Sequence, residues 1–103
     1  MKLLTKEIIK RLEKYPLYSQ QGKALDSKVL VKFFNPTGCG TWLITEAQNK
    51  NGQWLFYGYA ELGNGYEAGY IDMFSLENFK GKWNLGIERD MYSKLTTVKE
   101  MMK

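Results

Sequence analysis

Residues 41–72 carry the pattern that most restricts the fold of this chain, because three β-prone runs there are separated by two short turns. The first turn, at residues 49–52, ends in Asn51-Gly52, a pair that suits the positive φ angles of a tight hairpin. The second turn, at residues 62–65, contains Gly63 and Gly65. Strands joined by such short turns pair antiparallel, so the sequence predicts an antiparallel meander.

The segments on either side of this meander predict helices and further strands. Residues 29–34 and 83–88 are typical of strands. At the N-terminus, Thr5 is placed to cap a helix that Pro16 ends, with apolar side chains at helical spacing. Ser75 is expected to cap a short helix that ends near Gly81, and Thr97 is expected to cap a C-terminal one.

These elements define one α+β domain, and a chain of 103 residues has room for one hydrophobic core of normal size. We expect a single domain over residues 1–103. It should contain an antiparallel meander sheet of four or five strands, with the N-terminal helix packed on one face. Short helical segments are expected near residues 75–80 and at the C-terminus.

Strand alternation divides the predicted sheet into two faces, provided that both turns hold an even number of residues. One face is mostly apolar with small residues, and we expect the N-terminal helix to cover it. The other combines aromatic rings with carboxylates and could either stabilise the sheet by cross-strand pairing or bind a partner. The binding hypothesis assigns to the partner surface Trp42, Glu46, Tyr57, Tyr59, Glu61, Tyr70 and Asp72.

The composition excludes several kinds of chemistry. The chain has no histidine and a single cysteine, Cys39, so it holds neither a histidine-based catalytic centre nor an intrachain disulfide. We expect no catalytic residues, no metal site and no cofactor. No apolar run is long enough to cross a membrane and no signal peptide is recognisable, so the sequence predicts a cytoplasmic protein that does not associate with membranes.

Charge is distributed unevenly along the chain, although the formal net charge is only +4. Residues 1–32 carry eight cations and three anions, whereas residues 33–79 carry one cation and five anions. The basic start supports an alternative in which the N-terminal helix binds nucleic acid through phosphate contacts. The residues assigned to that alternative are Lys6, Lys10, Arg11 and Lys14.

Two runs carry a resemblance to a known family. Residues 33–46 read Phe-Phe-Asn-Pro-Thr-Gly-Cys-Gly-Thr-Trp-Leu-Ile-Thr-Glu, and residues 85–90 read Leu-Gly-Ile-Glu-Arg-Asp. Together with residues 69–71 and 75–81, they resemble a family of small proteins of unknown function carried on bacterial plasmids, conjugative elements and phages. The resemblance covers about residues 3–91. It implies an accessory protein of a mobile element and supplies no catalytic residues.

Three hypotheses about function follow. The first is a non-enzymatic protein that binds a host protein or nucleoprotein complex, which includes counter-defence proteins such as inhibitors of CRISPR or restriction systems. The second is a nucleic-acid-binding module that uses the basic N-terminal helix. The third is a small hydrolase that uses two of the carboxylates on the aromatic face. The sequence leaves the identity of the partner and the oligomeric state open.

Overall fold

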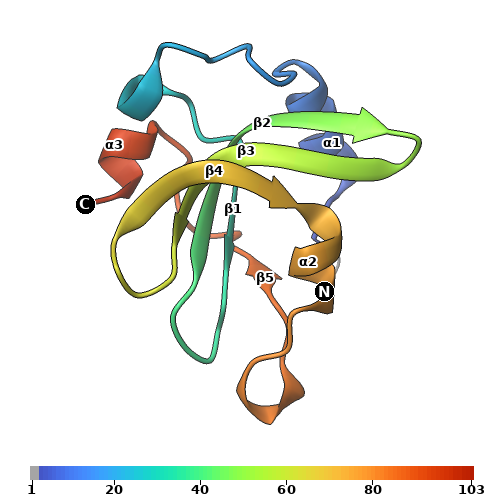
Figure 1. The fold of residues 1–103 in the computed structure, drawn as a ribbon, viewed down its shortest axis with the longest axis vertical. Helices are drawn as coiled ribbons and strands as arrows, with labels where there is room; N and C mark the ends of the chain where they lie inside the picture. The colour runs from blue at the N-terminus through green and yellow to red at the C-terminus, as the bar shows by residue number, and fades with distance from the viewer. Residues whose placement is uncertain (1–2) are drawn as a thin grey trace.

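The computed structural model describes residues 3–103 and contains one five-stranded antiparallel sheet in the order β4-β3-β2-β1-β5 (Figure 1). Its strands are β1 (Val31–Phe34), β2 (Thr41–Lys50), β3 (Gln53–Glu61), β4 (Tyr66–Asp72) and β5 (Glu88–Arg89). The helices are α1 (Lys6–Glu13), α2 (Met73–Asn78) and α3 (Val98–Met101), with 3-10 turns η1 (Ala24–Asp26) and η2 (Lys82–Asn84). The predicted α+β class, with an antiparallel meander and an N-terminal helix, is confirmed.

Helix α1 forms where its cap and apolar spacing predict it. The Thr5 hydroxyl accepts the N–H of Ile8 at 3.3 Å, which satisfies one donor at the helix start. Ile8 and Leu12, one turn apart, are buried in the core. The helix stops before Pro16, and the carbonyl of Tyr15 then accepts the N–H of Ala47 on β2 at 3.0 Å. This bond ties the end of α1 to the sheet.

A β-bulge at Thr45 divides β2 into two halves of opposite parity. Ile44 lies opposite Gly58 of β3, and Glu46 lies opposite Tyr57, so Thr45 is an additional residue without a partner of its own. Simple alternation counted from the residues before the bulge therefore assigns the residues after it to the wrong face of the sheet. The turns do not reveal this insertion, because the β2–β3 and β3–β4 loops each hold an even number of residues, as simple alternation requires.

The main core lies between α1 and one face of the sheet. It is formed by buried side chains of α1, α2 and β1–β3, together with flanking residues, namely Leu3, Ile8, Leu12, Leu30, Val31, Phe33, Trp42, Ile44, Ala47, Phe56, Met73, Leu76 and Ile87. Trp42 reaches this core because it precedes the bulge. The prediction that Trp42 shares a face with Tyr57 is therefore wrong.

The opposite face of the sheet carries a second, smaller cluster of Val29, Leu43 and Val98. Tyr59 and Tyr66 pack against this cluster from β3 and β4. Helix α3, which Thr97 caps by accepting the N–H of Glu100 at 3.3 Å, lies beside η1 at this end of the sheet (Figure 1). The face away from α1 is thus covered by α3 at one end.

Two predicted boundaries are wrong. Helix α2 starts at Met73, because the Asp72 carboxylate caps it by accepting the N–H of Ser75 at 2.8 Å, whereas the sequence prediction placed the cap at Ser75. The strand predicted over residues 83–88 is confined to its end, since Trp83 and Asn84 have positive φ angles of 56° and 60° within η2. Of residues 83–89, only Glu88 and Arg89 pair with β1.

Candidate functional site

Three of the four predicted aromatic rings lie on the face away from α1. Tyr57 and Tyr70 are directly opposite one another on β3 and β4, with ring centroids 5.3 Å apart and planes inclined by 74°. Tyr59 follows two residues later on β3 and points to the same face. Tyr57 and Tyr59 are half-buried, and Tyr70 is 56% exposed. The fourth residue, Trp42, packs edge-on against Phe79 in the main core.

A further ring comes from the segment between α1 and η1, which folds over this face. Tyr18 lies at a positive φ angle of 75°, a strained conformation for a residue with a side chain. The Tyr70 hydroxyl donates to the Tyr18 hydroxyl at 3.4 Å. Sequence reasoning missed Tyr18, because residues 16–28 are polar and show no periodicity that would assign them to a face.

Glu46 anchors this segment from below. One carboxylate oxygen accepts the N–H of Tyr18 at 2.7 Å, and the other accepts the N–H of Gln20 at 2.8 Å. The side chain of Glu46 is 5% exposed. The expectation that Glu46 edges an exposed patch is therefore wrong. Its carboxylate instead accepts hydrogen bonds from two backbone N–H groups of the loop. These charge-assisted bonds hold Tyr18 beside Tyr70.

The buried amide of Gln20 completes the anchor. Its nitrogen donates to the carbonyls of Lys28 at 2.9 Å and Thr45 at 2.7 Å, and its oxygen accepts the N–H of Lys28 at 2.7 Å. The Thr45 hydroxyl donates to the carbonyl of Tyr57 at 3.2 Å. Residues 16–28 are thus held to the sheet by the backbone carbonyl of Thr45 and the side chain of Glu46, while the hydroxyl of Thr45 bonds the bulge to β3.

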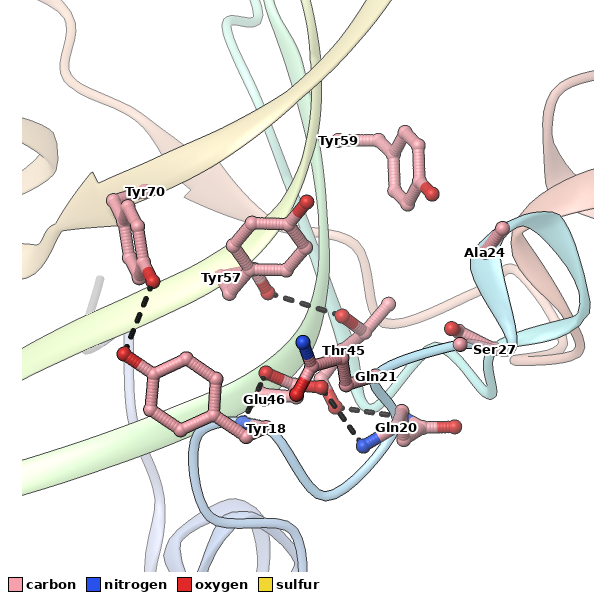
Figure 2. A pocket seen from close by; sticks show the side chains of 11 residues that line it. Tyr18, Gln20, Gln21, Ala24, Ser27, Thr45, Glu46, Tyr57, Tyr59 and Tyr70 are labelled. Atoms are coloured by element: carbon pink, nitrogen blue, oxygen red, sulfur yellow. Dashed lines mark hydrogen bonds between the residues drawn. The ribbon is translucent and has the colours of Figure 1, made fainter.

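Between this segment and the sheet lies a hollow of about 330 Å³, here termed the tyrosine hollow. Its volume is within the range of small binding pockets. Figure 2 shows Tyr18, Tyr57 and Tyr70 on one side and Ala24 and Ser27 on the other. The complete lining is Tyr18, Gln20, Gln21, Gly22, Ala24, Ser27, Thr45, Glu46, Tyr57, Tyr59 and Tyr70.

Two phenol groups of this site, those of Tyr59 and Tyr70, have a raised pKa. Burial raises the pKa of Tyr59, and the neighbouring Tyr57 adds to the effect. The pKa of Tyr70 is raised first by its hydrogen bond with Tyr18, then by desolvation and by nearby negative charge, including that of Glu46. Both hydroxyls therefore stay neutral at physiological pH, and the rings keep an electron-rich face.

The other predicted carboxylates lie apart from the tyrosine hollow. Glu61 accepts the N–H of Gly63 in the turn that follows β3. Asp72 caps α2 and lines a different hollow, beside Trp54. Each of the predicted carboxylates thus has a hydrogen-bonding use within the fold, and Glu46 and Asp72 face different cavities.

The basic residues predicted to bind nucleic acid differ in their exposure to solvent. Lys6, Lys10 and Lys14 are exposed. Arg11 differs, because its Nη1 donates to the carbonyl of Leu30 at 2.6 Å and its side chain is partly buried. The predicted basic row is therefore reduced to three lysines, and Arg11 serves to link α1 with the start of β1.

Asp90 forms a dense charged contact at the end of β5. Its carboxylate accepts the N–H groups of Tyr92 and Ser93, both at 2.9 Å, and the Ser93 hydroxyl at 2.6 Å. The Lys32 ammonium lies 3.3 Å away. Desolvation acts to raise the pKa of Asp90, but the Ser93 and Tyr92 hydrogen bonds and Lys32 outweigh it and hold the pKa well below its usual range.

We expect Asp90→Asn to destabilise the protein at pH 7 and to matter less in acid. The folded-state pKa lies below the unfolded value of about 3.9, so the carboxylate contributes stability above that value. The contribution is lost as the pH falls through the folded-state pKa. Urea unfolding of both proteins at pH 7 and pH 2.5 measures this, and an equal deficit at the two pH values would contradict it.

Neither a metal cluster nor a membrane-spanning helix is found in the part of the chain that the structure describes. Over residues 3–103, no three His, Cys, Asp or Glu side chains are grouped so that they could hold a metal ion. No helix in the same range combines the length and apolar character needed to cross a membrane. Cys39 is exposed and forms no disulfide.

The chain belongs to a family described as protein of unknown function (DUF2958), whose model matches residues 3–101. The resemblance to a family of unknown function is confirmed to this extent. The match spans every helix and strand, and so it includes all the residues that line the tyrosine hollow. No curated protein and no solved structure matches the chain.

Proposed function

We propose that this protein acts by binding a partner protein at the tyrosine hollow and catalyses no reaction. The observation that carries the proposal is the convergence of four tyrosines from the loop, β3 and β4 around one open cavity. Tyrosine side chains are enriched at binding hot spots, because they offer a large, rigid contact area at low entropic cost. The hydrogen bonds of Glu46 preorganise this surface, which lowers the cost of binding.

The expected partner surface is basic. Residues 33–79, which supply most of the sheet, carry one cation and five anions. Such an excess favours association with positive charge and disfavours phosphate. The basic ends of the chain, chiefly the lysines of α1, lie outside the tyrosine hollow.

Within this proposal, the protein is a cytoplasmic accessory protein of a plasmid, conjugative element or phage. Its partner is a host protein or nucleoprotein complex, and CRISPR and restriction complexes are the leading cases. Complexes that handle nucleic acid present positively charged channels, which an acidic aromatic surface could occupy. The support is the sequence resemblance together with the charge of the central segment.

The two other hypotheses have weaker support. Hydrolysis by paired carboxylates requires both groups beside one substrate bond. Both oxygens of Glu46 accept backbone N–H groups, and Asp72 faces another cavity. Nucleic-acid binding is left with Lys6, Lys10 and Lys14, since Arg11 is bound to Leu30.

Capture from host lysate should depend on the tyrosine hollow. We expect a protein partner, identified by mass spectrometry, to be retained by the wild type and lost with Tyr57→Ala/Tyr70→Ala. The matched control is Tyr92→Ala, which truncates a tyrosine that is 93% exposed and lies outside the hollow.

The same experiment separates the alternatives. Nuclease treatment should leave the captured protein in place, and so should Lys6→Gln/Lys10→Gln/Lys14→Gln. Capture that is lost with nuclease and with the lysine variant, but survives the tyrosine variant, would contradict the proposal in favour of nucleic-acid binding.

A further inference from the structure

The tyrosine hollow combines aromatic rings with one uncompensated negative charge. Of its eleven lining residues, four are tyrosines and Glu46 alone carries a formal charge. Among residues 3–103, no lysine or arginine lies within salt-bridge distance of Glu46. Its two hydrogen bonds come from neutral backbone N–H groups, so the charge itself is not cancelled. Buried charges in proteins are normally paired, and among residues 3–103 no cation forms that pair with Glu46.

The rings around this charge are arranged to accept a cation. Tyr57 and Tyr70 meet edge to face at 5.3 Å, and the Tyr18 hydroxyl contacts that of Tyr70 at 3.4 Å (Figure 2). The faces of aromatic rings attract cations, and cages of several rings bind organic cations. The attraction increases in a partly desolvated site, such as the space beneath the loop at residues 16–28.

We propose that the tyrosine hollow receives the guanidinium group of an arginine side chain, presented by the protein partner. This inference rests on the proposed function and specifies the chemistry that the partner must offer. The cation would pack against the exposed face of a tyrosine ring in the hollow and compensate the charge of Glu46.

Arginine fits this hollow better than lysine does. Each Glu46 oxygen already accepts one backbone N–H, which leaves limited acceptor capacity for an ammonium group that must replace a strong hydration shell. A guanidinium group is planar, is more weakly hydrated and stacks on aromatic rings. Its five N–H donors can also reach the hydroxyls of Tyr18 and Tyr70 and the exposed amide of Gln21.

The test uses small peptides and needs no partner. The peptide acetyl-Gly-Arg-Gly-amide is titrated into ¹⁵N-labelled protein and followed by NMR, beside the citrulline and lysine peptides. We expect saturable shifts at Tyr18, Gln20, Tyr57 and Tyr70, with a dissociation constant on the order of 1 mM. The citrulline peptide, which keeps the shape without the charge, should bind about fivefold more weakly or worse. Tyr57→Ala/Tyr70→Ala should abolish the shifts, and Tyr92→Ala should not.

Four results would overturn the inference. These are no saturable binding of the arginine peptide, equal binding of the arginine and citrulline peptides, equal or tighter binding of the lysine peptide, and shifts confined to residues outside the hollow. The outcome is distinct from that of the capture experiment. If the partner is lost with Tyr57→Ala/Tyr70→Ala but the arginine peptide does not bind, the choice of cation is wrong and the proposed function stands. If the peptide binds the hollow but no partner depends on it, the proposed function is wrong and the cation site stands.

Discussion

Replacing Gly58 by alanine should destabilise the domain by about 3 kcal/mol or more, because no space exists for the added methyl group. A Cβ at this position would lie 2.0 Å from the carbonyl oxygen of Leu43 and 3.0 Å from the Cα of Ile44. Both atoms belong to the β2 backbone and cannot rotate away. Gly58 pairs with Ile44, directly before the bulge at Thr45, so the close approach of β2 and β3 depends on the missing side chain.

The neighbouring strand offers a matched control. Gly69 lies directly opposite Gly58 on β4, and a Cβ there would meet no atom within 4 Å. Gly69→Ala should therefore change the free energy of unfolding by no more than about 0.5 kcal/mol. Urea denaturation followed by circular dichroism compares the two variants. Similar midpoints for Gly58→Ala and Gly69→Ala would show that the described packing of β2 on β3 is wrong.

The second large effect is expected from Glu46→Gln, which keeps the length of the side chain but removes its charge. A glutamine offers one acceptor oxygen, so either the partly buried N–H of Tyr18 or the buried N–H of Gln20 loses its partner. The remaining bond also loses its ionic character. We expect a loss of about 2–3 kcal/mol in the free energy of unfolding, concentrated in the segment at residues 16–28.

Amide hydrogen exchange locates this effect. The N–H groups of Tyr18 and Gln20 should exchange markedly faster in Glu46→Gln than in the wild type, whereas those in the centre of β3 should change less. The control is Glu61→Gln, which removes a charge from the side chain bonded to Gly63 in an exposed turn. Unchanged protection at both Tyr18 and Gln20 would contradict the anchoring role of Glu46.

The sequence predicts those parts of the fold that depend on local interactions. The Asn51-Gly52 turn, the Thr5 and Thr97 caps and the alternation of β3 and β4 each involve residues close together in the chain. The bulge at Thr45 is different, because it reflects how β2 bends against β3 and leaves no signature in hairpin length. Because the sequence does not reveal the bulge, alternation assigns Trp42 to the wrong face of the sheet.

The candidate site was predicted only in part for the same reason. Tyr57, Tyr59 and Tyr70 share a face by alternation alone, and they are found together. Tyr18 joins them through the bond from its backbone N–H to Glu46, 28 residues away in the chain. A contact between residues so far apart in the chain leaves no periodic pattern in the sequence. Burial of Glu46 likewise follows from the loop above it and not from its position in β2.

The structure shows which tyrosines of the hollow are best suited to a test. Tyr59 packs against the cluster of Val29, Leu43 and Val98, so its truncation would disturb the core beneath α3. Tyr70 is exposed, and Tyr57 contacts it from the centre of the hollow. Tyr57→Ala/Tyr70→Ala therefore removes the contact surface at the lowest cost to the fold.

Calorimetric titration of the purified partner into the wild type and into Tyr57→Ala/Tyr70→Ala tests the central claim most directly. A truncated aromatic anchor typically costs about 2 kcal/mol or more of binding free energy, so we predict an affinity at least about thirtyfold weaker for the variant. Circular dichroism should show that the variant keeps its fold. A folded variant that binds the partner as tightly as the wild type would contradict the assignment of the tyrosine hollow as the binding site.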